Sequence, residues 1–300
     1  MHKVLFSFLL FLLHFGDLFG SCLVRGDFKN NDTTLFVHIL QYRDGNELTI
    51  INKEVKDNLF IYQFPENFEE GIYRVNVITT NHFSFFDIIV LKSEKNIDFE
   101  FDNSKPFNLP IFTKSEINKN WFSFIEYALE NRKSLLELYD YKKSSQTKNI
   151  TNDKIDEAVN NHIIEYKTKK NEFISKHNNP WISLMLNSIN YSGNEFEIQW
   201  ENTINEKELM NEITNDNRKL LNTPLLKDYI QTKIVSEISK QKSSKESSKL
   251  VVQIYCDLID KFSINDLVKK CIIRYAIIGF RENKDMDSEK YISNKYSYYM

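Results

Sequence analysis

The chain has 300 residues, of which 41% are hydrophobic and 27% charged, and this length suits about two domains with ordinary cores. Lys and Arg total 39 against 42 for Asp and Glu, so the net charge of −3 gives no electrostatic basis for binding nucleic acid. The sequence has seven Gly and contains neither G-x-G-x-x-G nor G-x-x-x-x-G-K-[ST], which excludes these two nucleotide-binding loops.

The N-terminal segment predicts export. Met1–Lys3 is a short basic start, Val4–Leu13 is an apolar run, and small residues follow before Cys22. The apolar run is shorter than the roughly 20 residues that a membrane span needs, so we predict a signal peptide over residues 1–21. The protein is therefore expected in the periplasm or anchored on the cell envelope.

Cys22 has two interpretations. Phe19-Gly20-Ser21 resembles a degenerate lipobox, which would make Cys22 the acylated first residue of a lipoprotein. Alternatively, signal peptidase cleaves before Cys22 and this residue begins a β-strand. We favour the second interpretation, because a lipidated Cys normally precedes a flexible tether and regular structure is predicted here at once. Contact with the membrane is expected only if Cys22 is lipidated.

The pattern of residues 22–104 is that of short β-strands separated by polar breaks. Asp44-Gly45-Asn46 is a hairpin signal, because Gly adopts positive φ at no steric cost. Several strands, notably Phe85–Leu91, are apolar on both sides, which suits strands between two layers. We predict an antiparallel β-sandwich of about seven strands. The strands are expected over Cys22–Phe28, Thr34–Tyr42, Glu47–Lys53, Asn58–Phe64, Gly71–Thr80, Ser84–Leu91 and Ile97–Phe101.

Pro106 and Pro110 predict a linker over residues 105–114, and beyond it the apolar period changes from 2 to 3.6. We predict an all-α domain over residues 115–300, so the expected fold class is α+β. The helices are expected from Ser115 to Tyr141, over Asp153–Ser175, from Pro180 onward, over Glu206–Ile213, Leu225–Ser239, Lys245–Phe262 and Ile264–Arg281, and from Ser288 onward.

No metal or cofactor is predicted. His162 and Glu165 stand one helical turn apart, as metal ligands do, but a di-metal carboxylate bundle needs a second Glu-x-x-His pair and further inward Glu residues. We therefore interpret the pair as part of an exposed polar face.

Cys256 and Cys271 are the remaining cysteines, and the sequence contains no C-x-x-C. A turn at Ser263-Ile264 would put both at one height on a helical hairpin. Cys271 lies on an apolar stripe, whereas Cys256 falls roughly 100° from the stripe of its own helix. We favour two small buried residues, and a redox pair formed by Cys256 and Cys271 is the alternative.

The order of leader, sandwich and helices, with Phe112-Thr-Lys-Ser-Glu-Ile-Asn-Lys-Asn-Trp-Phe122 opening the helical part, resembles envelope thioredoxin-like proteins of the thiol-specific-antioxidant superfamily. Leu220-Leu-Asn-Thr-Pro-Leu-Leu-Lys227 is similar to a Pro-containing stretch of their helical region. The resemblance covers residues 22–300 and implies a following thioredoxin domain with a Cys-x-x-Cys site, which this sequence does not contain. It therefore implies only an accessory role, and no catalytic residue can be carried over.

These observations predict a non-catalytic exported envelope protein that binds a protein partner, expected to be thioredoxin-like. No strong catalytic motif is present, so we lean against an enzyme. One alternative is a redox-active protein using Cys256 and Cys271. Another is a glycan- or polymer-binding surface protein using Trp181, Tyr191 and Trp200, since aromatic residues make up 14% of the chain.

Overall fold

The chain forms two structural units. The first comprises Met1–Gln41 with Thr49–Glu126, and the second comprises Tyr42–Leu48 with Tyr127–Met300. The tip of one β-hairpin thus belongs to the unit that contains most of the helices. The computed structural model describes residues 21–29, 35–80, 82–102, 104, 108–146, 153–188, 218–231, 252–253, 256–257, 259–260 and 266–299. Residues 1–20 of the predicted signal peptide lie outside this set.

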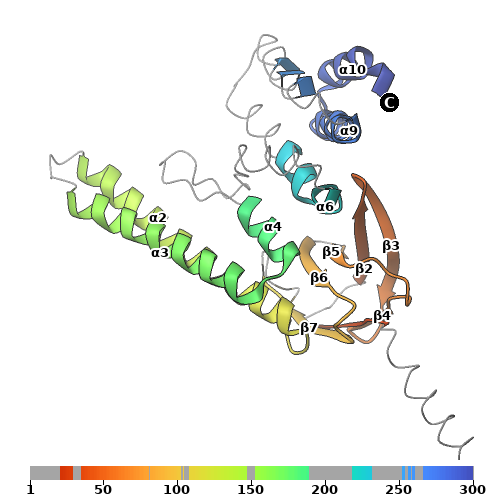
Figure 1. The fold of residues 1–300 in the computed structure, drawn as a ribbon, viewed down its shortest axis with the longest axis horizontal. Helices are drawn as coiled ribbons and strands as arrows, with labels where there is room; N and C mark the ends of the chain where they lie inside the picture. The colour runs from red at the N-terminus through yellow and green to blue at the C-terminus, as the bar shows by residue number, and fades with distance from the viewer. Residues whose placement is uncertain are drawn as a thin grey trace, which may run out of the picture. The chain divides into compact units, whose positions relative to one another are not determined.

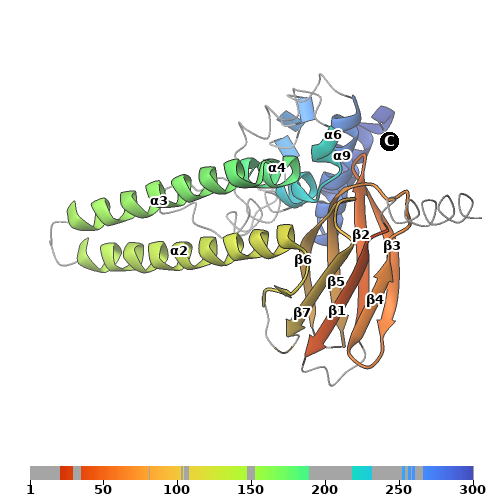
Figure 2. The same cartoon turned by 60° about the horizontal axis from the view of Figure 1, so that its bottom comes forward.

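Two four-stranded sheets build the first unit (Figure 2). The strands are β1 (Leu23–Lys29), β2 (Leu35–Arg43), β3 (Asn46–Val55), β4 (Leu59–Gln63), β5 (Gly71–Thr79), β6 (Phe83–Val90), β7 (Asn96–Asp102) and β8 (Ile111–Phe112). One sheet has the order β4-β1-β7-β8 and the other the order β3-β2-β5-β6. The seven predicted strands are confirmed, and so is the α+β fold class.

Aromatic side chains fill the space between the sheets. The ring of Phe86 on β6 lies 5.2 Å from that of Phe99 and 5.4 Å from that of Phe101, both on β7. β7 alternates buried and partly exposed residues along its length, as a strand with one face in the core must. Gly26 on β1 makes room for this packing, because a Cβ there would lie 2.6 Å from the Phe99 ring.

One strand pair departs from the predicted antiparallel arrangement. β1 runs antiparallel to β4, but parallel to β7 from Leu23↔Asn96 to Lys29↔Asp102. A parallel pair needs a long connection, and here the chain between the two strands passes through β2 to β6. The pattern of residues within each strand carries no signal for such a distant pairing.

The stretch predicted as a linker contains the short strand β8. It pairs with β7 at Phe99↔Phe112, and the Phe112 ring lies 4.9 Å from that of Phe122. Two residues that follow Pro110 are too few to show the alternation of a strand, so the sequence pattern gives no sign of it.

Asn118 joins the first helix to the edge of a sheet. The helix α2 (Glu116–Gln146) begins after Ser115, whose hydroxyl oxygen accepts from the Asn118 N–H at 3.3 Å. The side-chain amide of Asn118 accepts from the Ile89 N–H and donates to the Ile89 carbonyl, both at 2.8 Å. The fully buried amide thus satisfies both main-chain groups of one β6 residue.

The second unit contains the remaining helices and the far part of α2. They are α3 (Asp153–His177), α4 (Pro180–Ser188), α6 (Arg218–Leu221), α9 (Asp266–Glu282), α10 (Met286–Lys295) and the 3₁₀ helix η2 (Ser297–Tyr299), with further helical residues at 225–231. In Figures 1 and 2, α2 and α3 lie side by side. Within the second unit, the Lys142 ammonium pairs with Asp156 at 2.7 Å across these two helices.

Polar side chains cap the starts of two later helices. Asn179 accepts from the N–H groups of Trp181 and Ile182, at 2.9 and 3.2 Å, just before Pro180 opens α4. Asp285 accepts from the Ser288 N–H at 3.1 Å, so α10 starts at Met286 rather than at Ser288 as predicted. The Asp285 cap places the start two residues earlier.

Three helix predictions extend over residues that the structure does not describe. Glu206–Ile213 lies wholly outside the described residues. Leu225–Ser239 is described only at 225–231, and Lys245–Phe262 only at 252–253, 256–257 and 259–260, all of which are helical. The prediction over Ile264–Arg281 is confirmed by α9 from Asp266 onward, and residues 264–265 lie outside the described set.

The β2–β3 turn packs on helical residues of its own unit. Asp44 and Gly45 have positive φ of 49° and 70°, as the two central residues of a tight hairpin turn require. The Gly45 N–H donates to the Leu221 carbonyl at 2.9 Å, and the Gly45 carbonyl accepts from the Tyr275 hydroxyl at 2.7 Å. A Cβ on Gly45 would lie 2.9 Å from the Cβ of Cys271 and closer still to its Sγ. The turn therefore requires glycine for two separate reasons.

We expect Asn118→Ala to lower the free energy of unfolding by about 2 to 4 kcal/mol, because it leaves both main-chain groups of Ile89 without their side-chain partner. The matched control is Asn120→Ala, which removes an exposed amide of the same helix and should change stability by less than about 0.5 kcal/mol. Urea denaturation of the two variants gives the comparison. Equal losses would contradict the role assigned to Asn118.

Gly45→Ala should lower the free energy of unfolding by about 2 to 4 kcal/mol, because it adds a clash with Cys271 to an unfavourable positive φ. In a Cys271→Ala background the sulfur is absent, so Gly45→Ala should cost about 1 kcal/mol less. The positive φ and the close contact between the two Cβ atoms remain in that background. A double-mutant cycle by denaturant unfolding measures the difference. Identical losses in the two backgrounds would show that Gly45 and Cys271 do not contact.

Candidate functional site

The outward face of the sheet β3-β2-β5-β6 carries three cross-strand rows. Side chains two residues apart point to the same face of a strand, and the register of β2, β5 and β6 aligns them. The first row is Phe36, Ile78 and Phe83; the second is His38, Asn76 and Phe85; the third is Leu40, Arg74 and Asp87.

The first two rows expose three phenylalanine rings. Phe36, Phe83 and Phe85 are 39%, 60% and 52% exposed, and the rings of Phe83 and Phe85 lie 6.2 Å apart. Single exposed apolar residues are ordinary, so exposed rings that share one sheet face are the more informative feature. We call Phe36, Phe83 and Phe85 the aromatic face.

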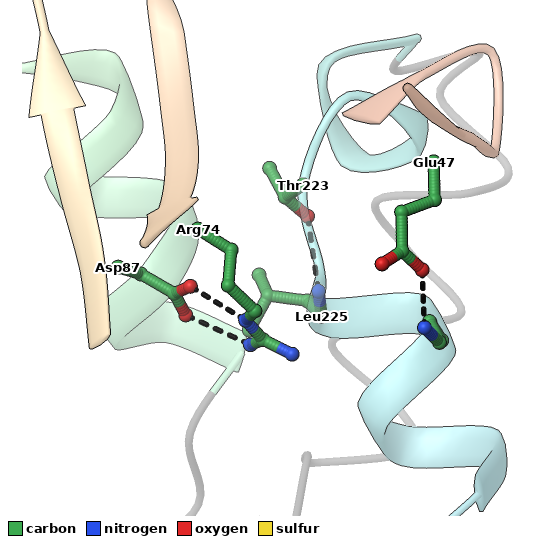
Figure 3. Close-up of polar contacts among 6 residues, drawn as sticks. Glu47, Arg74, Asp87, Thr223 and Leu225 are labelled. Atoms are coloured by element: carbon green, nitrogen blue, oxygen red, sulfur yellow. Dashed lines mark hydrogen bonds and ion pairs between the residues drawn. The ribbon is translucent and has the colours of Figure 1, made fainter. Parts of the chain in front are cut away.

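A partly buried ion pair supports the aromatic face from the third row. Arg74 and Asp87 oppose each other on β5 and β6, and their side chains meet in two contacts, with Nε to Oδ1 at 2.8 Å and Nη2 to Oδ2 at 3.0 Å (Figure 3). The Arg74 guanidinium also lies 4.4 Å from the centre of the Phe85 ring. Bidentate pairing fixes the guanidinium plane, so it holds the Phe85 ring in place.

The aromatic face offers contact area rather than a set of reacting groups. The polar side chains in these three rows are His38, Asn76 and the Arg74–Asp87 pair, in which each charge already neutralises the other. A face of this kind suits recognition of another molecule by packing.

Cys256 and Cys271 are free and buried in the structure. The Cys271 thiol lies 3.4 Å from the Asp44 carbonyl oxygen, and burial raises the pKa of this thiol to about 11. The Cys256 main-chain carbonyl accepts from the Tyr296 hydroxyl at 3.4 Å. The two cysteines thus pack against different partners, and a redox role for them stays a prediction.

Cys22 lies directly before β1 and is also buried. Its carbonyl accepts from the Phe64 N–H at 2.8 Å, and burial, with a smaller contribution from Glu94, raises the pKa of its thiol to about 12. This placement agrees with the interpretation in which Cys22 begins a strand. An acyl chain on the sulfur would displace the packing around it, and lipidation stays an untested prediction.

His162 and Glu165 contact different partners on α2 and α3. The His162 Nδ1 lies 3.2 Å from the Asn131 side-chain nitrogen, and Glu165 pairs with Lys169 at 3.2 Å. Among the described residues, no group of three or more His, Cys, Asp or Glu side chains is arranged to hold a metal ion.

The aromatic residues singled out from the sequence do not form this site. Trp181 is buried in α4, and Tyr191 and Trp200 lie outside the described residues. The sequence does not identify Phe36, Phe83 and Phe85 as exposed, because their strands are apolar on both sides, as buried strands are. The available signal is one polar residue of outward parity in each run, His38 in Leu35–Leu40 and Asp87 in Phe85–Leu91.

Comparison with protein-family models, curated proteins and solved structures finds no match to this chain. The resemblance to thioredoxin-like envelope proteins therefore stays a prediction. In the part of the chain that the structure describes, no helix combines the length and apolar character needed to cross a membrane.

We expect Cys22 and Cys271 of the native protein to react with iodoacetamide at pH 8 less than about 1% as fast as in urea, because only the thiolate reacts and burial disfavours it. Peptide mapping by mass spectrometry after a timed pulse distinguishes the three cysteines. Labelling of native Cys271 as fast as glutathione would contradict its burial.

The same thiols make the fold sensitive to alkaline pH. In the unfolded chain a thiol ionises near its ordinary pKa of about 8.5, whereas the pKa of Cys271 in the folded protein is about 11. Because the unfolded state loses its proton first, this contribution to stability is complete below pH 8.5 and declines as the pH rises toward 11. Urea denaturation midpoints between pH 7 and pH 10 should fall less for Cys271→Ala than for the parent chain.

Proposed function

We propose that the protein is a non-catalytic binding protein of the cell envelope, and that the aromatic face contacts a protein partner. The observation that carries this proposal is the exposure of Phe36, Phe83 and Phe85 on one face of one sheet, with the rings of Phe83 and Phe85 6.2 Å apart. The envelope location rests on the signal peptide predicted over residues 1–21. A thioredoxin-like partner is what the sequence resemblance implies.

The chemistry of the aromatic face favours a protein over a glycan. Phenylalanine has no polar group with which to select sugar hydroxyls, whereas it packs well against aliphatic and aromatic side chains. The nearby charges of Arg74 and Asp87 are paired with each other and partly buried. A partner that offers apolar side chains therefore fits the face better than one that offers hydroxyl groups.

Selection from a library of random 12-residue peptides displayed on phage tests this proposal. We expect the purified protein to enrich peptides rich in apolar residues. The variant Phe83→Ser/Phe85→Ser should bind the most frequent peptide at least tenfold more weakly by fluorescence anisotropy, as expected when contact residues at the centre of an interface are truncated.

Ile111→Ser is the matched control, because Ile111 is an exposed apolar residue of the same unit on β8, away from the aromatic face. It should bind the selected peptide like the parent chain. No enriched peptide, or equal effects of the two changes, would overturn the proposal. Binding on a glycan panel with no selected peptide would assign the face to carbohydrate instead.

A further inference from the structure

The hydrogen bonds at the two ends of β6 establish which of its residues face β5. At one end the Thr79 N–H donates to the His82 carbonyl at 2.9 Å. At the other end both main-chain groups of Ile89 bond to the Asn118 side chain and so point away from β5. In an antiparallel pair the two directions alternate residue by residue. Even-numbered residues of β6 therefore bond to β5, and odd-numbered residues point their main-chain groups outward.

Phe83 and Phe85 consequently direct their N–H and C=O groups to the open side of the strand. β6 is the last strand of its sheet. Among the described residues, neither phenylalanine bonds through these outward groups to another part of the chain. The segment Phe83–Phe86 contains no Lys or Pro, the residues that commonly protect an exposed edge.

The bonds of Asn118 show which kind of group can pair with this edge. Its amide presents one acceptor and one donor to Ile89 in the way that a residue of a neighbouring strand would. Four residues back along the same edge, Phe85 has the same outward main-chain pair without such an amide. Among the residues that the structure describes, this built-in partner covers only the Ile89 end of the edge.

The rings of the aromatic face are placed to receive the side chains of such a partner. Phe83 and Phe85 are two residues apart, which is the repeat of an extended chain, and both rings lie on the outward face. A strand added to β6 would place every second side chain on that face, next to these rings. Main-chain bonds and ring contacts would then be made by one extended segment.

We propose that β6 binds its partner by β-strand addition, and that the partner is an extended peptide segment with apolar side chains at alternate positions. The segment pairs with the outward main-chain groups of Phe83 and Phe85 and packs its apolar side chains against the aromatic face. This inference rests on the proposed function and names the binding mode and chemistry of the partner.

Amide hydrogen exchange with the peptide selected from the phage library tests the binding mode. Selective ¹⁵N-phenylalanine labelling reduces the NMR spectrum to phenylalanine amides, and Phe83→Ala and Phe85→Ala assign the two that matter. We expect both amides to exchange at least about tenfold more slowly when the peptide is bound, since each acquires a hydrogen bond. The Phe86 amide, which already faces β5, should not change and serves as the internal control.

A pair of variants at one position separates the main-chain bond from the ring. Phe85→Ala and Phe85→Pro both remove the ring, but only the proline removes the outward N–H, which an edge strand tolerates. We expect the proline variant to bind the peptide about fivefold more weakly than the alanine variant, which corresponds to one hydrogen bond. Circular dichroism and the unchanged Phe86 amide check that the sheet is intact in both variants.

Peptide binding without protection of the Phe83 and Phe85 amides, or equal affinities of the two variants, would overturn strand addition while leaving the proposed function in place. Failure to select any peptide would overturn the proposed function itself. Sedimentation of the free protein provides the remaining test. A concentration-dependent dimer that protects the same two amides would assign the edge to a second copy of the chain and contradict the proposal.

Discussion

The alternation along β6 is the constraint on which the rest of the first unit depends. Residues of one parity, such as Phe86, pack toward β7 and bond to β5, so they build the core and the sheet together. Residues of the other parity direct both their side chains and their main-chain groups away from that core and from β5. One face of β6 therefore completes the core of the sandwich. Its other face carries the exposed rings, and the side of the strand away from β5 is the edge of the sheet.

Two sets of polar contacts limit how much of β6 is available to a partner. The Asn118 amide closes the edge at Ile89, and the Arg74–Asp87 pair occupies the outward face in the third row. The Asn118 amide is buried and the ion pair is partly buried, and in both the polar groups have partners, so neither leaves an uncompensated group. Within the described part of the chain, the short segment around Phe83 and Phe85 is what stays open. The candidate site therefore stops at Asp87, where these polar contacts begin.

The sequence predicts the elements well and the site poorly, for a physical reason. Turn residues such as Asp44-Gly45 and caps such as Asn179 act over a few residues, so they can be recognised locally. Whether Phe85 or Phe86 faces the core depends on what covers each face, and a strand with apolar residues of both parities gives no answer. The parallel pairing of β1 with β7 likewise depends on residues about seventy positions apart.

Neither the rings nor the main-chain groups would suffice alone for stable binding. Covering an exposed phenylalanine gains about 2 kcal/mol, and association costs at least about 4 kcal/mol before any side chain is ordered. Two rings therefore do little more than offset the cost of bringing the partner in. Each main-chain hydrogen bond adds about 1 kcal/mol, and an edge residue can make two. Useful affinity thus requires rings and edge to be engaged by the same extended segment, which is why their coincidence on Phe83 and Phe85 matters more than either feature.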